Sequence, residues 1–118
     1  SYFFLDSSPS VIASTGAKKG YNYASRYSEY ESLETTKLYN KYSLANWIWI
    51  DVFKTLPINK NISSEINSLN MKVCLTSPDL LGREEDIPSY AKLIKDSKLN
   101  LDAICCKYKN IKHWKSLF

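Results

Sequence analysis

Five short apolar runs recur along the 118-residue chain at intervals that each fit one β-strand, one loop and one helix. The runs are "YFFLD" (2–6), "YNYASR" (21–26), "NWIWIDVF" (46–53), "KVCLTS" (72–77) and "LDAICCK" (101–107). Segments of helical period separate them; Ile62, Ile66 and Leu69, for example, stand at i, i+4 and i+7. Because alternating β and α units form parallel sheets with right-handed crossovers, we expect a single α/β domain over residues 1–118 with a five-stranded parallel sheet.

The repeat leaves two arrangements of this sheet open. Five βα units can form part of a TIM barrel, or they can form an open doubly wound sheet of the flavodoxin type. In both arrangements, ligands bind at the loops that follow the carboxyl ends of the strands. The residues at those ends are therefore the candidates for a ligand-binding site.

Polar side chains follow all five predicted strands. The candidates for ligand binding are Asp6, Arg26, Glu29, Glu31, Asp51, Ser77, Asp79, Arg83 and Lys107. Carboxylates, a hydroxyl and basic groups that converge suggest a site for a metal ion or a phosphate. Strands also end in polar residues simply because they end at the surface, so each position has a purely structural alternative. No catalytic residue is assigned.

Asp51 is the most distinctive of these candidates. It directly follows Ile50 in the run "NWIWIDVF" (46–53), in which Asn46 is the only other polar side chain. Trp47, Trp49 and Phe53 would anchor the backbone on either side and fix the carboxylate. A fixed carboxylate can hold a polyol, a cation or a neighbouring arginine, for which Arg26 and Arg83 are the two possibilities.

Charge and composition exclude several classes of function. The net charge of +4 comes from scattered lysines with only two arginines, which is not the basic stripe of a nucleic-acid-binding protein. No stretch approaches the roughly 18 to 20 apolar residues of a membrane span.

Cys74, Cys105 and Cys106 lie in apolar runs without metal-type spacing, so we expect reduced, buried thiols in a cytoplasmic protein. His113, the sole histidine, is expected in the last helix.

Four strand-end residues resemble, in their order, the functional positions of response-regulator receiver domains. Asp6, Asp51, Thr76 and Lys107 follow the first, third, fourth and fifth predicted strands. The resemblance implies that Asp51 would be a phosphoacceptor. The chain departs from that family at Tyr108, where receivers usually carry a proline.

A second resemblance rests on sequence strings that cover nearly the whole chain. "FFLDSSPSVI", "SRYSEYE", "WIWIDVF", "KVCLTSPDLLGR" and "DAICCK" are similar to the second half of bacterial barrel proteins related to glycerophosphodiester phosphodiesterases, in the phospholipase-C-like phosphodiesterase superfamily. This resemblance implies a partial, or half, TIM barrel that binds a small phosphorylated or sugar-like ligand. A divalent cation is the candidate cofactor.

The same resemblance implies that this chain alone is not an active phosphodiesterase. In that superfamily the two catalytic histidines lie on the first strands of the barrel, and His113 in a terminal helix cannot supply both a general acid and a general base. A partial barrel also leaves open sheet edges that must be covered. We therefore expect a homodimer, and a non-catalytic structural or assembly module is the third functional alternative.

Overall fold

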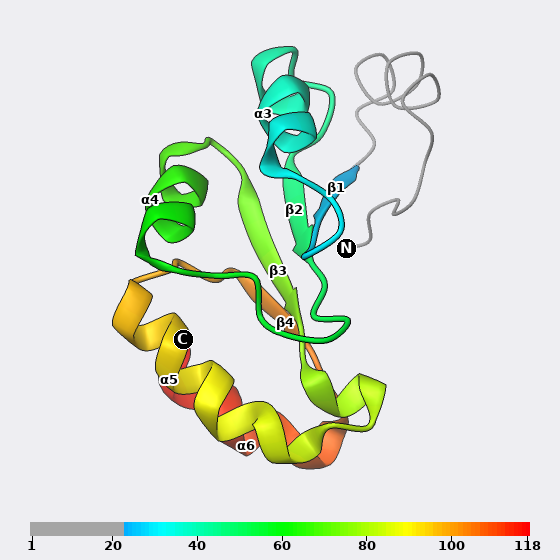
Figure 1. The fold of residues 1–118 in the computed structure, drawn as a ribbon, viewed down its shortest axis with the longest axis vertical. Helices are drawn as coiled ribbons and strands as arrows, with labels where there is room; N and C mark the ends of the chain where they lie inside the picture. Colours follow the sequence, from blue (N-terminus) through cyan, green and yellow to red (C-terminus); the bar gives the residue numbers. More distant parts are fainter. Residues whose placement is uncertain (1–22) are drawn as a thin grey trace.

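The computed structural model describes residues 23–118, which form a parallel β-sheet with helices packed against it (Figure 1). In chain order the elements are β1 (Ala24–Tyr27), α3 (Leu33–Lys41), β2 (Trp47–Ile50), α4 (Lys60–Ser68), β3 (Lys72–Thr76), the 3-10 helices η2 (Pro78–Leu81) and η3 (Glu84–Asp86), α5 (Ile87–Ser97), β4 (Ala103–Cys105), η4 (Tyr108–Asn110), α6 (Ile111–Trp114) and η5 (Lys115–Leu117). The prediction of an α/β fold with a parallel sheet is confirmed for these residues. The predicted strand 2–6, with Asp6, lies outside the described residues.

The four described strands are hydrogen-bonded in chain order, β1-β2-β3-β4, and every pair is parallel. Ala24 lies opposite Trp47, and Trp47 lies opposite Lys72. In the flavodoxin-type order the first strand of the chain lies between the second and the third. In that order no four successive strands pair each with the next, as β1, β2, β3 and β4 do here.

The two faces of the sheet have different roles. The face that packs against the helices carries Ile48, Ile50, Val73 and Leu75, which join Leu33 of α3, Ile66 of α4 and Ile94 of α5 in one buried cluster. In Figure 1 these three helices follow one another along one side of the sheet. Since side chains alternate along a strand, Arg26, Trp49 and Cys74, which lie opposite one another in the register, share the other face.

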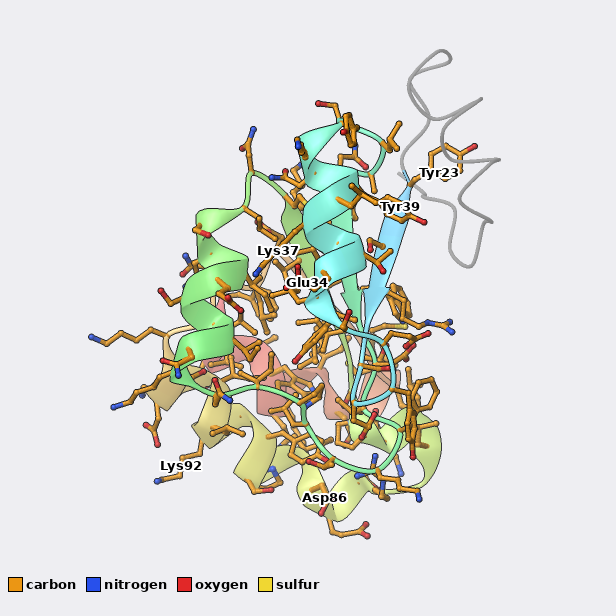
Figure 2. The ribbon with its side chains drawn as sticks, turned by 45° about the horizontal axis from the view of Figure 1, so that its top comes forward. Tyr23, Glu34, Lys37, Tyr39, Asp86 and Lys92 are labelled. Atoms are coloured by element: carbon orange, nitrogen blue, oxygen red, sulfur yellow. The ribbon has the colours of Figure 1, made fainter. Side chains whose placement is uncertain are left out.

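A second, smaller cluster lies at the amino-terminal end of the sheet. It contains Tyr23, Tyr39 and Ala45, with Leu44 and Met71 packed against it. Figure 2 shows Tyr39 of α3 next to Tyr23. The cluster joins α3 to the chain that enters β1 and therefore fixes this end of the molecule.

Local signals explain where the helices begin and end. Asn59 caps α4, since its side-chain oxygen accepts a 2.8 Å hydrogen bond from the Ile62 amide, and Ile66 is 1% exposed, as its helical spacing predicts. Gly82 follows η2 with a φ of 76°, a conformation that glycine adopts without strain. This turn sends the chain back so that the Arg83 amide bonds the Pro78 carbonyl at 2.9 Å.

Several predicted elements are shorter than expected, and the run 101–107, for example, is a strand only from Ala103 to Cys105. The run 46–53 is a strand only from Trp47 to Ile50, because the Phe53 amide bonds a side chain instead of continuing the ladder. The expected last helix is divided into η4, α6 and η5. This segment is held to the end of β3 by Trp114, whose indole N–H donates to Ser77 Oγ at 3.0 Å.

Candidate ligand-binding site at the carboxyl edge of the sheet

An ion pair joins the carboxyl ends of β1 and β2. Arg26 lies opposite Trp49, and Asp51 follows Trp49 by two residues, so both side chains leave the sheet on the face opposite the helices. Arg26 Nε lies 2.8 Å from Asp51 Oδ2, and the Asp51 residue is only 8% exposed. The guanidinium is therefore the partner that fixes the Asp51 carboxylate, and Arg83 is not.

The turn after β1 brings a second carboxylate to the same guanidinium. Ser28 Oγ donates to the Glu31 carboxylate and accepts hydrogen bonds from the amides of Tyr30 at 3.0 Å and Glu31 at 3.2 Å. Glu31 Oε1 is 3.8 Å from Arg26 Nη1. Arg26 consequently lies between two carboxylates that come from neighbouring loops.

Two aromatic rings border this charged group. The ring centroids of Tyr30 and Phe53 are 5.7 Å apart with an interplanar angle of 38°, and the Arg26 guanidinium carbon lies 6.0 Å from the Phe53 centroid. Tyr30 is 63% exposed and Phe53 is 39% exposed. Neither residue is on the list of predicted ligand-binding residues, although Tyr30 belongs to the tyrosine-rich stretch 21–31 and Phe53 shares the alternation of Trp49 and Asp51.

Glu29 uses its carboxylate to hold the loop between β2 and α4. Oε1 accepts a hydrogen bond from the Phe53 amide at 3.0 Å, and Oε2 accepts from the amides of Lys54 at 2.9 Å and Thr55 at 2.7 Å. Burial alone would raise the pKa of Glu29, but these amide donors outweigh it and lower the pKa below its ordinary value. Glu29 and Glu31 thus point to different partners.

Arg83 holds the same loop by donating hydrogen bonds to the carbonyl groups of the loop backbone. Its guanidinium donates to the carbonyl oxygens of Val52, Phe53 at 3.3 Å and Lys54 at 3.1 Å, and also to Asp86 Oδ2 at 3.0 Å and Tyr90 Oη at 2.8 Å. One acidic and one basic side chain therefore bind the backbone of residues 52–55 from two sides. We call Glu29 and Arg83 the loop clamp.

Asp79 is an internal residue at the end of β3. It is 1% exposed, and its Oδ2 accepts hydrogen bonds from the Lys107 amide at 3.1 Å and from Asn110 Nδ2 at 2.5 Å. Burial would raise the pKa of Asp79, but donors that include Asn110 and the Lys107 amide lower it. Asp79 joins the loop after β3 to the loop after β4, and Ser77 acts in the same way by accepting from Trp114.

The predicted candidates thus divide into two groups. Arg26, Glu31 and Asp51 lie together at the ends of β1 and β2, whereas Glu29, Arg83, Ser77 and Asp79 have internal hydrogen-bond partners. The Lys107 residue is exposed at the end of β4. Thr76 ends the neighbouring strand β3, on the same face of the sheet as Asp51. Within residues 23–118 its buried hydroxyl oxygen has no hydrogen-bond partner.

Charged pairs outside this edge connect helices. Glu34 and Lys37 project from α3 on the side of α4 (Figure 2), where Lys37 Nζ lies 3.3 Å from Glu34 Oε1 and 3.1 Å from Glu65 Oε1. Pairs of this kind, exposed on helix surfaces, contribute little to stability. They do place further carboxylates beside the β1–α3 turn.

The cysteines and acidic residues do not form a metal or nucleophilic centre in this part of the chain. Burial and the neighbouring Cys105 raise the pKa of the Cys74 thiol to about 12, which keeps it protonated. Nowhere in residues 23–118 do three or more His, Cys, Asp or Glu side chains gather as metal ligands would. None of the helices in that range combines the length and apolar character needed to cross a bilayer.

No family model, curated protein or solved structure matches the chain. The geometry of the carboxyl edge is therefore the basis for a functional assignment.

Proposed function

We propose that the chain is a ligand-binding domain of the partial TIM-barrel type, related to phosphodiesterases, which takes a phosphorylated or sugar-like ligand at the carboxyl edge of its sheet. The observation that carries the proposal is the Arg26 and Asp51 pair on adjacent strand ends, with the Glu31 carboxylate beside it. Ligands of parallel α/β sheets bind at this edge. The chain order of the four described strands is that of an arc of a barrel.

The chemistry of this group suits a ligand rich in hydroxyl groups. Carboxylates accept hydrogen bonds from hydroxyls, and a guanidinium donates to oxygen atoms, including those of a phosphate. Binding without cleavage is proposed, since no general acid and base pair has been assigned at this edge.

The experiment is a thermal-shift and calorimetric titration with glycerol 3-phosphate, glucose 6-phosphate, methyl glucoside and inorganic phosphate. A ligand at a hundred times its Kd should stabilise the native chain by about 2.7 kcal/mol. We expect Asp51→Asn and Arg26→Lys each to weaken binding by about tenfold or more, since each removes part of a fixed charged pair.

Asp96→Asn is the matched control, because Asp96 is an exposed carboxylate of α5 that pairs only with Lys92 in the described contacts. The control should bind as the native chain does. If none of the four compounds stabilises the native chain, or if Asp51→Asn binds as tightly as the control, the proposal is wrong. Calorimetry well below the unfolding temperature separates lost binding from lost stability.

The receiver-type alternative is not favoured by the geometry. Receivers have the flavodoxin-type strand order, whereas the four described strands here pair in chain order. Asp51 is held by Arg26, and among residues 23–118 no set of three acidic side chains gathers that would bind a metal ion beside it.

Self-association stays a prediction that follows from the open edges of a partial barrel. Sedimentation velocity at micromolar concentration should give a dimer of about twice the 13.6 kDa chain mass. A single species at the monomer mass over that concentration range would contradict it.

A further inference from the structure

We infer that Tyr30 and Phe53 form a platform on which the apolar face of a neutral sugar ring packs. This inference rests on the proposed function and narrows its ligand to a saccharide, with the flanking carboxylates of Glu31 and Asp51 accepting hydrogen bonds from the ring hydroxyls. The two aromatic residues are called the aromatic platform below.

The aromatic platform offers an exposed apolar surface. Its two rings come from different loops, lie 5.7 Å apart and remain substantially exposed. Large aromatic side chains that gather at the surface next to polar groups are typical of binding sites, because a ring offers rigid apolar area with little loss of side-chain freedom on binding. The C–H faces of a pyranose ring are complementary to such a surface.

The platform is also held in place before any ligand arrives. The backbone of Phe53 is bound by the loop clamp, since its amide donates to Glu29 and its carbonyl accepts from Arg83. The amide of Tyr30 donates to Ser28 Oγ at 3.0 Å within a tight turn. A surface that is already ordered loses less conformational entropy on binding.

The charges around the platform favour a neutral ligand over an anionic one. Tyr30, but not Phe53, lines a surface pocket of about 470 Å³ whose wall also contains Glu29, Glu31, Glu34 and Glu65. Lys37 pairs with both Glu34 and Glu65, but the four carboxylates still outnumber it, so a phosphate or a nucleotide would meet like charge there, whereas hydroxyl groups find acceptors. Arg26, 6.0 Å from the Phe53 centroid, supplies the donor on the other side.

The experiment is an NMR titration of the whole chain with the methyl glycosides of glucose, galactose and mannose, each to about 10 mM, as weak single-site ligands require. We expect upfield shifts of sugar C–H signals and shifts of the amides of Tyr30 and Phe53. Tyr30→Ala and Phe53→Ala should weaken binding about fivefold, and Tyr30→Phe should retain it, because the ring and not the hydroxyl forms the surface.

Tyr42→Ala is the matched control. Tyr42 is 58% exposed and has the Lys41 ammonium 5.5 Å from its ring, but no second ring is paired with it in the described residues. It should bind sugars as the native chain does. Folding of every variant is checked by its Tm, which should change little because both platform residues are exposed.

Three results would overturn the inference. The first is no shift with any of the glycosides, and the second is equal affinity of Tyr30→Ala and Tyr42→Ala. The third is binding of adenosine monophosphate, with the same dependence on Tyr30, in place of the sugars. A parallel titration with glycerol 3-phosphate keeps the two proposals apart: if it binds in an Asp51-dependent manner and the glycosides do not, the platform fails and the proposed function stands.

Discussion

Arg83→Ala is expected to lower the free energy of unfolding by about 3 kcal/mol, because a partly buried guanidinium that donates to five acceptors would be lost. Three of those acceptors are carbonyl groups of the loop between β2 and α4. The loop would then lose one half of the clamp, so the amides of residues 53–55, which Glu29 would still accept from, should exchange with deuterium faster than in the native chain. Urea unfolding followed by tryptophan fluorescence gives the first quantity, and NMR-detected hydrogen exchange gives the second.

Two further variants make this result specific. Arg83→Lys should recover less than half of the loss, because one ammonium group cannot reproduce the planar arrangement of the guanidinium donors. Lys92→Ala is the control, since its side chain is 80% exposed and pairs only with Asp96 among the described contacts; a change below about 0.5 kcal/mol is expected. An Arg83→Ala protein as stable as Lys92→Ala, with unchanged exchange at 53–55, would show that the loop does not depend on the clamp.

Asp79→Ala is expected to have an effect of similar size, about 3 kcal/mol, for a different reason. Removal of the buried carboxylate leaves the Lys107 amide and the Asn110 side-chain amide without their acceptor. Asp79→Asn keeps one oxygen and should lose less. Unfolding by urea at neutral pH, compared with Asp96→Asn, measures both differences.

The effect of Asp79 should also depend on pH in a defined direction. The folded state lowers the pKa of Asp79 below its ordinary value of 3.8, so the charged form stabilises the fold. This contribution is fully present above the ordinary pKa and is lost as the pH falls through the lower pKa of the folded state. The difference in stability between the native chain and Asp79→Asn should therefore shrink on acidification. A difference that stays constant or grows as the pH falls would contradict the assigned hydrogen bonds.

The sequence predicts the sheet well because strand identity is a local property. The runs that contain Trp47–Ile50 and Lys72–Thr76 are too short and too apolar for surface helices, and the Ile62 and Ile66 spacing marks the buried side of α4. The order of the strands is not local. The hydrogen-bonded pairing of β1, β2, β3 and β4 in chain order distinguishes the observed sheet from the flavodoxin type.

The functions of the strand-end charges could be predicted only in part. If the register of β1 with β2 were known, the alternation of side chains along the two strands would identify Arg26 as the partner of Asp51. In contrast, Glu29 and Arg83 bind backbone groups that lie 24 to 31 residues away in the chain. A carboxylate accepts equally well from a ligand or from a backbone amide, and only the conformation of the distant loop decides between them.

The loop clamp has a consequence for how this protein could change over evolutionary time. Glu29 and Arg83 bind residues 52–55 entirely through the backbone amide and carbonyl groups of that segment, which nearly every amino acid possesses. The side chains of Phe53, Lys54 and Thr55 can therefore be exchanged without loosening the loop that carries them; proline, which lacks the amide hydrogen, is the exception. The backbone conformation of this loop is thus independent of the side chains that it exposes, so the surface of the carboxyl edge can change by point substitution while its shape is kept.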